Sequence, residues 1–191
     1  IIPAATTYIG NQPAIPFNIT LNRGQVYQLM SDGDLAGTTI VASKPVGVIS
    51  GAPSVDFPAG FYHTGSPAFE QLPPTDAWGT EHIAAPLARQ YSGIYRIVAA
   101  FDDTRVDIAP SLGGAPINFT LNRGKFYDLR YPGLLQFSST KPVLVSQMVT
   151  NTAWEPKSRD TAYGDPGMVI VPPTSNWGNN AAAYAPALDP R

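Results

Sequence analysis

The residue types that acid–base or nucleophilic chemistry needs are scarce in this chain. It has only two histidines, His63 and His82, which are far apart in sequence, and it has no cysteine. A Ser-His-Asp triad needs an oriented base beside its nucleophile, and no Gly-x-Ser-x-Gly segment is present. We therefore predict that both histidines are surface or turn residues and that the chain is not an enzyme.

Carboxylates gather at two places, Asp32 with Asp34, and Asp102 with Asp103 and Asp107. Several carboxylates on one loop are the beginning of a calcium site, but the first group matches only the start of an EF-hand pattern. Aspartates in turns more often accept backbone N–H groups. The sequence thus favours turn caps, predicts no metal and no cofactor, and singles out no carboxylate pair for glycoside hydrolysis.

Asn18 and Asn118 each begin an Asn-x-Thr sequon, the acceptor sequence for N-glycosylation. Their equivalent positions in two similar segments favour a shared role. Duplication of a strand is the alternative explanation, because threonine is favourable in strands. Both asparagines are therefore candidate glycosylation sites.

Two other pairs of residues recur at equivalent points. Trp78 and Trp177 each follow a Pro-Pro-Thr segment. Such aromatics can form a ligand platform, but we expect both to be buried core anchors in equivalent sites. Arg23 and Arg123 stand in equivalent turns, where a carboxylate contact and a solvated turn tip are equally good explanations.

The composition favours an exported β protein. Charged residues are 14% of the 191 residues, the formal net charge is −2, and proline and glycine number 20 and 17. No basic patch indicates a nucleic-acid partner, and no apolar run approaches the length of a membrane span. Few lysines and no cysteines accompany abundant Ser, Thr, Tyr and Asn. We expect a secreted or cell-surface location.

The chain contains an internal duplication of about one hundred residues. The matching segments keep their order at offsets of 97 to 100 residues, and the first pair agrees at eight of twelve positions. The pairs are Asn18–Leu29 with Asn118–Leu129, Lys44–Val46 with Lys141–Val143, Leu72–Gly79 with Val171–Gly178, and Ala85–Pro86 with Ala185–Pro186. We divide the chain into a first repeat, 1–94, and a second repeat, 95–191, which together form either two units or one continuous domain.

Short alternating segments separated by turn residues predict antiparallel strands throughout. The predicted hairpins join Phe17–Leu21 to Val26–Met30, Thr38–Ala42 to Val46–Ser50, and Tyr95–Ala100 to Arg105–Ala109. The fold class is therefore all-β, with antiparallel meanders in two repeats arranged as a propeller-like fold or as paired β-sandwiches. The start, Ile1–Ala5, is matched to Ile97–Ala100. We expect the chain to be a piece of a longer protein.

Six segments resemble, in their order, the amino-terminal domain of the IgG-Fc-binding protein family. They are Gly24–Leu29, Asp34–Thr38, Ser43–Gly51, Glu70–Gly79, Tyr95–Ala100 and Gly164–Pro173. Vertebrate members carry cysteines in the stretch that corresponds to Ala52–Phe69, which has none here, so a divergent, adhesin-type member is expected. The resemblance implies an extracellular location and a binding or structural role, and it implies no catalytic residues.

Two functional hypotheses follow. The first is an extracellular binding or adhesion module whose partner is a protein or a glycan. The second is a structural subunit that assembles with copies of itself into a filament or matrix, because exposed strand edges accept further strands. Neither hypothesis involves nucleic acid or membrane insertion.

Overall fold

The computed structural model describes residues 1–10, 12–55, 66–87, 92–150 and 167–179. These residues form strands and two single-turn 3-10 helices, so the all-β class is confirmed. The strands are β1 (Tyr8–Ile9), β2 (Gln12–Pro13), β3 (Ile49–Val55), β4 (Ser66–Gln71), β5 (Gly79–Ala84), β6 (Gly93–Ala99), β7 (Thr104–Pro110), β8 (Ile117–Leu121), β9 (Phe126–Tyr131), β10 (Leu135–Val149) and β11 (Gly167–Val171), and the helices are η1 (Thr75–Ala77) and η2 (Thr174–Asn176). Across the described part of the chain, no helix is long and apolar enough to cross a membrane.

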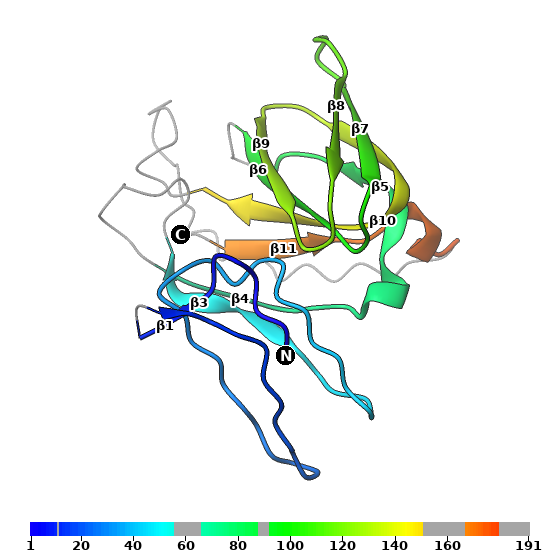
Figure 1. The fold of residues 1–191 in the computed structure, drawn as a ribbon. Helices are drawn as coiled ribbons and strands as arrows, with labels where there is room; N and C mark the ends of the chain where they lie inside the picture. The colour runs from blue at the N-terminus through cyan, green and yellow to red at the C-terminus, as the bar shows by residue number, and fades with distance from the viewer. Residues whose placement is uncertain (11, 56–65, 88–91, 151–166, 180–191) are drawn as a thin grey trace, which may run out of the picture.

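Seven of the strands form one antiparallel sheet that curls on itself into a half-barrel (Figure 1). Its order is β8-β7-β10-β6-β9, and β5 and β11 also pair with β10. Two further ribbons, β1–β2 and β3–β4, lie outside this sheet. Among the described residues this arrangement is neither a set of propeller blades nor a pair of separate sandwiches.

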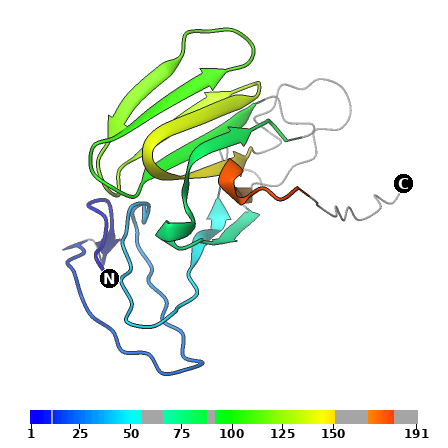
Figure 2. The ribbon, with the colours of Figure 1, turned by 90° about the vertical axis from the view of Figure 1, so that its right-hand side faces the viewer.

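Strand β10 joins the sheet together because it is used twice. Its first stretch, Leu135–Ser139, pairs with β7 on one side and with β5 on the other. Its second stretch, Val143–Val149, pairs with β6 and β11. The register shifts between Ser138 and Val143, where Pro142 has no N–H for the ladder. Two halves, β8-β7-β10-β5 and β9-β6-β10-β11, therefore share one bent strand, whose turn is visible in Figure 2.

The core fills the inside of this curl. Strands β6 and β7 alternate buried and more exposed residues, which is the pattern of strands with one face on a core. Both stretches of β10 contribute side chains with almost no exposure. The buried cluster consists of Ala84, Tyr95, Ile97, Ala99, Val106, Ile108, Leu121, Leu135, Phe137, Val143, Val145 and Val171. All of these except Ala84 belong to the second repeat.

The two copies of the Asn-Arg-Gly segment form the same tight turn, as predicted. The amide of Gln25 donates to the carbonyl of Asn22 at 3.0 Å, and that of Lys125 donates to Asn122 at 2.9 Å. Gly24 and Gly124 have φ angles of 82° and 71°, a region that residues with a side chain rarely adopt. The sequence match thus reflects a shared backbone conformation.

The two Pro-Pro-Thr segments also share their conformation. Each leads from a strand into a 3-10 turn, η1 or η2, and each turn ends at the tryptophan. The preceding prolines have φ and ψ of −63° and 155° at Pro74, and −66° and 151° at Pro173. The rigid proline explains why both copies enter the turn from the same direction.

The ribbon β3–β4 is the first-repeat counterpart of β10–β11. An offset of 97 carries Ile49 to Ser146, and an offset of 99 carries Gln71 to Ile170. Ile49 pairs with Gln71 in the first ribbon, and Ser146 pairs with Ile170 in the second. The ladder register is therefore the same in both repeats. Since β5 also pairs with β10, the halves 1–94 and 95–191 share one sheet, and the boundary between them stays a prediction.

The predicted pairing within hairpins is wrong in each case. Strands β8 and β9 are joined by the 122–125 turn, but β8 pairs with β7 and β9 with β6. Strands β6 and β7 likewise pair with different stretches of β10 and not with each other. Each pair is thus a β-arch, two strands joined by a turn and lying in opposite halves of the curl. The bend in β10 causes this, because it offers separate edges to successive strands.

The first repeat forms fewer strands than predicted. The segments 17–21 and 26–30 form no ladder with each other, and of 38–42 only Thr39 makes an isolated bridge, to Ile2. Of the predicted strand Val46–Ser50, the last two residues begin β3. In Figures 1 and 2 the two long loops of this repeat project away from the curled sheet.

The match of Ile1–Ala5 to Ile97–Ala100 is also wrong. Ile1 exchanges backbone hydrogen bonds with Phe17, and Ile2 does so with Thr39. In the second repeat, the residues that correspond to Phe17 and Thr39 pair with Ile108 and Ala109 of β7. Ile1 and Ile2 therefore occupy the place of the last part of β7, and Ile-Ile-Pro aligns with Ile108-Ala-Pro110.

Tyr95 is expected to be a weak point of this core. Its hydroxyl is buried without a hydrogen-bond partner in the described structure, and burial raises the pKa of Tyr95 to about 12. A buried unsatisfied polar group costs about 1–3 kcal/mol. Tyr95→Phe should therefore leave the free energy of unfolding unchanged or raise it by about 1 kcal/mol, as measured by urea denaturation.

Tyr131→Phe is the matched control, because the Tyr131 hydroxyl accepts a hydrogen bond from the Leu112 amide at 2.9 Å. This variant should lose about 0.5–1.5 kcal/mol. An equal loss in both variants would contradict the account of Tyr95.

Candidate functional site

A cleft of about 540 Å³ lies where the first repeat meets the β8–β9 turn. Three segments line it, the N-terminal residues Ile2–Thr6, the loop 36–39 and the turn Arg123–Phe126. Its walls are mainly apolar, while the exposed residues Arg123 and Lys125 lie at the turn. No carboxylate within the described ranges pairs with either cation. The cleft thus combines an apolar wall with two unpaired positive charges.

Two glycines bring the walls of the cleft together. The backbones of Gly37 and Gly124 touch, and a Cβ atom at Gly37 would overlap the Gly124 carbonyl. Both glycines also have positive φ angles, 90° at Gly37 and 71° at Gly124. Glycine is suited to such close approach because it has no side chain. The contact fixes the spacing between the first-repeat loop and the β8–β9 turn.

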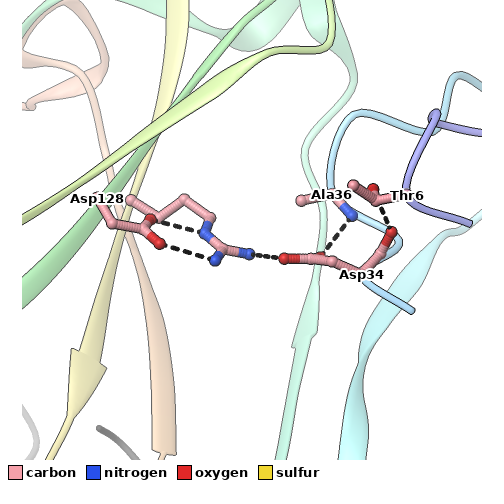
Figure 3. A network of polar contacts seen from close by, with 5 residues as sticks. Thr6, Asp34, Ala36 and Asp128 are labelled. Carbon is pink, nitrogen blue, oxygen red and sulfur yellow. Dashed lines mark hydrogen bonds and ion pairs between the residues drawn. The ribbon is translucent and has the colours of Figure 1, made fainter. Parts of the chain in front are cut away.

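A charged network beside the cleft joins the same two parts of the chain. Arg96, on β6, donates from Nε and Nη2 to the two Asp128 carboxylate oxygens at 2.8 and 2.9 Å. Its Nη1 donates to Oδ2 of Asp34 at 2.7 Å. Figure 3 shows Asp34 and Asp128 on opposite sides of the guanidinium. The Arg96 guanidinium also lies 4.0 Å from the centre of the Phe126 ring, a cation–π contact.

This network is well matched in charge. Partial burial lowers the pKa of Arg96, but hydrogen bonds to Asp128, together with the charges of Asp128 and Asp34, outweigh it and raise that pKa above its ordinary value. A bidentate arginine–carboxylate pair also fixes geometry. The cation is therefore permanent and orients the first-repeat loop on β6.

The carboxylates that the sequence singled out serve turns and ion pairs. Oδ1 of Asp34 accepts the Ala36 amide at 2.8 Å, so this carboxylate is used by a turn and by Arg96. Asp102 accepts the Arg123 amide at 3.0 Å. Asp107 pairs with Arg105. Among the described residues, no three His, Cys, Asp or Glu side chains are grouped to hold a metal ion.

His82 is buried, which corrects its prediction as a surface or turn residue. It lies on β5 and faces the core because the side chains of that strand alternate. Its ring nitrogens lie 3.1 Å from the Val171 carbonyl and 3.4 Å from the Gly79 carbonyl. This imidazole is not beside a hydroxyl nucleophile. His63 lies outside the described residues.

The two tryptophans differ in burial despite their equivalent backbones. Trp78 is half-buried, and its indole N–H donates to the Pro73 carbonyl at 3.0 Å. Trp177 is 53% exposed, so the prediction that both are buried is wrong for Trp177. The asymmetry arises because η2 packs beside β5, while η1 leads directly into that strand.

The remaining candidates lie on the surface. Asn18 and Asn118 are exposed, and Asn118 lies on β8 opposite Asp107. Arg23 is exposed at the tip of its loop, whereas Arg123 lines the cleft. Sequence reasoning therefore noted one cleft residue, Arg123, but as a turn tip without a ligand.

Sequence reasoning missed the Gly37–Gly124 contact and the Arg96 network. A signal existed for half of the network, since Arg96 is a charged residue inside the apolar strand Tyr95–Ala100. An unpaired charge is costly in such surroundings, so a carboxylate partner was to be expected. Nothing in the sequence identified that partner as Asp34, which is 62 residues away.

Replacing Gly37 should disrupt the junction. Gly37→Ala introduces a Cβ at positive φ and against the Gly124 carbonyl, whereas Gly24→Ala meets positive φ in open space. We expect Gly24→Ala to cost about 1–2 kcal/mol and Gly37→Ala about 1–3 kcal/mol more, measured by denaturant unfolding. Equal losses would show that the contact between the two glycines contributes nothing.

The buried His82 predicts acid sensitivity. Burial, which outweighs the hydrogen bonds to backbone carbonyls, lowers the pKa of His82 below 6.5. As the pH falls through about 6.5, the unfolded chain takes up a proton that the folded chain does not, so stability decreases. Melting temperatures should fall from pH 7 to 5, and His82→Gln should flatten that slope while leaving the difference between pH 7 and 8 unchanged. An identical slope in both proteins would exclude His82 as its origin.

Comparison with known proteins places this chain in a family. No solved structure matches it. The chain is 30% identical over 171 residues to the human IgGFc-binding protein, an alignment that covers 88% of this chain and 3% of that relative. The chain thus spans a small fraction of the relative's length. The family described as IgGFc binding protein matches residues 1–189. By this match over nearly its full length, the chain belongs to the IgGFc binding protein family.

Proposed function

We propose that this chain is an extracellular protein-binding module whose ligand contacts the cleft between Ile2–Thr6 and Arg123–Phe126. The observation that carries this proposal is the cleft itself, with an apolar wall and two unpaired cations. Apolar contact supplies affinity, and rim charges supply orientation and association rate.

The surroundings of the cleft support a preformed site. The Arg96 network and the contact of Gly37 with Gly124 hold its walls at a set spacing. Rigid scaffolds lose less entropy on binding, which favours affinity. A partner with a carboxylate beside an apolar side chain would match the chemistry of Arg123, Lys125 and the cleft wall.

The finer parts of this function are proposals of the same kind. The human relative is named for binding the Fc part of IgG, so Fc is the first ligand to test. Secretion or display at a cell surface, and a role in adhesion, follow if the ligand belongs to another cell or to a matrix. Glycosylation at Asn18 and Asn118 is compatible with their exposure. Nothing in this function requires catalysis.

Self-assembly into a filament or matrix is the second candidate function. The exposed apolar side chains of the first repeat favour it, because monomeric soluble proteins rarely expose a large contiguous apolar patch. Sedimentation velocity over a range of concentrations distinguishes the two. A monomer at all concentrations would exclude self-assembly of the isolated chain.

The binding function is tested with IgG Fc, in glycosylated and deglycosylated forms, by surface plasmon resonance. Arg123→Ser combined with Lys125→Ser should weaken binding by about tenfold and reduce its salt dependence, since rim charges act mainly on association. Binding only to the glycosylated form would identify the glycan as the ligand. A glycan array covers ligands without protein.

Arg105→Ser is the matched control, because Arg105 is exposed on β7 and pairs with Asp107 outside the cleft. It should bind like the unmodified chain. If neither Fc nor any glycan binds, the binding function is wrong; if the control and the double variant weaken equally, the cleft is not the site.

A further inference from the structure

Apolar side chains of the first repeat are exposed where their counterparts in the second repeat are in or against the core. Val46 is 54% exposed, whereas Val143 is fully buried. Leu21 is 43% exposed, whereas Leu121 is 9% exposed. The full set of pairs, at offsets of 97 to 100, is Ile19 with Phe119, Leu21 with Leu121, Tyr27 with Tyr127, Ile40 with Phe137, and Val46 with Val143. We call these five first-repeat residues the open face.

The second repeat shows what covers such a face. Phe119 lies opposite Val106 of β7, Tyr127 opposite Ile97 of β6, and Val143 opposite Ala99 of β6. The β6–β7 arch, Gly93 to Pro110, thus supplies the strands that bury these side chains. In the described first repeat, only Ile1 and Ile2 occupy a part of that place, the end of β7.

The backbone of the first repeat is also ready for such an arch. The segments 18–21 and 26–30 make no ladder with any described residue. Their counterparts in β8 and β9 are fully paired, with β7 and β6. Meanwhile β3–β4 keeps the register of β10–β11. The first repeat therefore has the outer strand positions of the fold and lacks those of β6 and most of β7.

We propose that the open face is a docking surface for a β6–β7 arch from a second copy of the repeat unit. The arch would pair with 18–21 and 26–30 and insert residues of the type of Tyr95, Ile97 and Val106 against the open face. This is strand complementation, in which main-chain hydrogen bonds give affinity and side-chain pockets give specificity. The inference rests on the open face alone and holds for either function proposed above.

Other occupants fit the face less well. A small ligand would cover the apolar side chains but leave two strand edges without partners. Two open faces packed together would bury the side chains, but each edge would still lack the strand of matching register that β6 provides. The arch satisfies both requirements at once, as it does in the second repeat.

The test grafts residues Gly93–Asp107 directly before Ile1 in the full chain. Since Ile1 occupies the place of Ile108, Asp107 then precedes it as in β7. We expect a higher melting temperature, less binding of the apolar dye ANS, and amide exchange in 18–21 and 26–30 that is slower by at least about tenfold. The free peptide 93–107, added in trans, should protect the same amides in a saturable manner.

The control is the same graft carrying Ile97→Asp and Val106→Asp in the added segment only, so that the natural β6–β7 arch is unchanged. It should behave like the ungrafted chain. Equal effects of both grafts, or no protection of 18–30 by the unmodified graft, would overturn the proposal. So would an ungrafted chain in which self-association alone protects these amides, because the occupant would then be a second open face. Fc binding through the cleft is measured separately and succeeds or fails independently.

Discussion

The fold depends on one strand that must satisfy two sheets. Strand β10 offers one pair of edges over Leu135–Ser139 and another over Val143–Val149, with a bulge and a proline between them. Each stretch also buries side chains in the same core, so the bend converts a flat sheet into a closed curl. Successive strands are drawn to different stretches of β10. That is why β6–β7 and β8–β9 form arches and not paired hairpins.

The cleft is a consequence of this geometry. Because β8 and β9 lie in opposite halves of the curl, the 122–125 turn projects at the rim, where the loop around Gly37 meets it. Arg96 extends from the outer face of β6, opposite its buried neighbours Tyr95 and Ile97. It therefore reaches Asp128 on the next strand and Asp34 on the first-repeat loop. The ion pairs are only partly buried, so their value is more in orienting that loop than in stabilising the fold.

The two repeats show how the same motifs produce different amounts of structure. The Asn-Arg-Gly turn and the Pro-Pro-3-10 corner form in both, because glycine and proline impose local backbone conformations. The strands beside these motifs form only where a neighbouring strand supplies hydrogen bonds and burial. Tyr127 contacts the core next to β6, while Tyr27 has no such neighbour and stays 44% exposed. Strand formation here is a tertiary property, and turn formation is a local one.

The sequence by itself determined the all-β class, the duplication, the family, and the equivalence of Gly24 with Gly124, since each depends on residue types at fixed spacing. It also indicated that the aspartates serve turns, as Asp34 and Asp102 do. Only the tertiary structure decided which strands pair, that His82 is buried, that Trp177 is exposed, and that Asp34 is the second partner of Arg96. These outcomes depend on contacts between distant segments. Local periodicity places a side chain on one face of a strand, but the bend in β10 decides what that face meets.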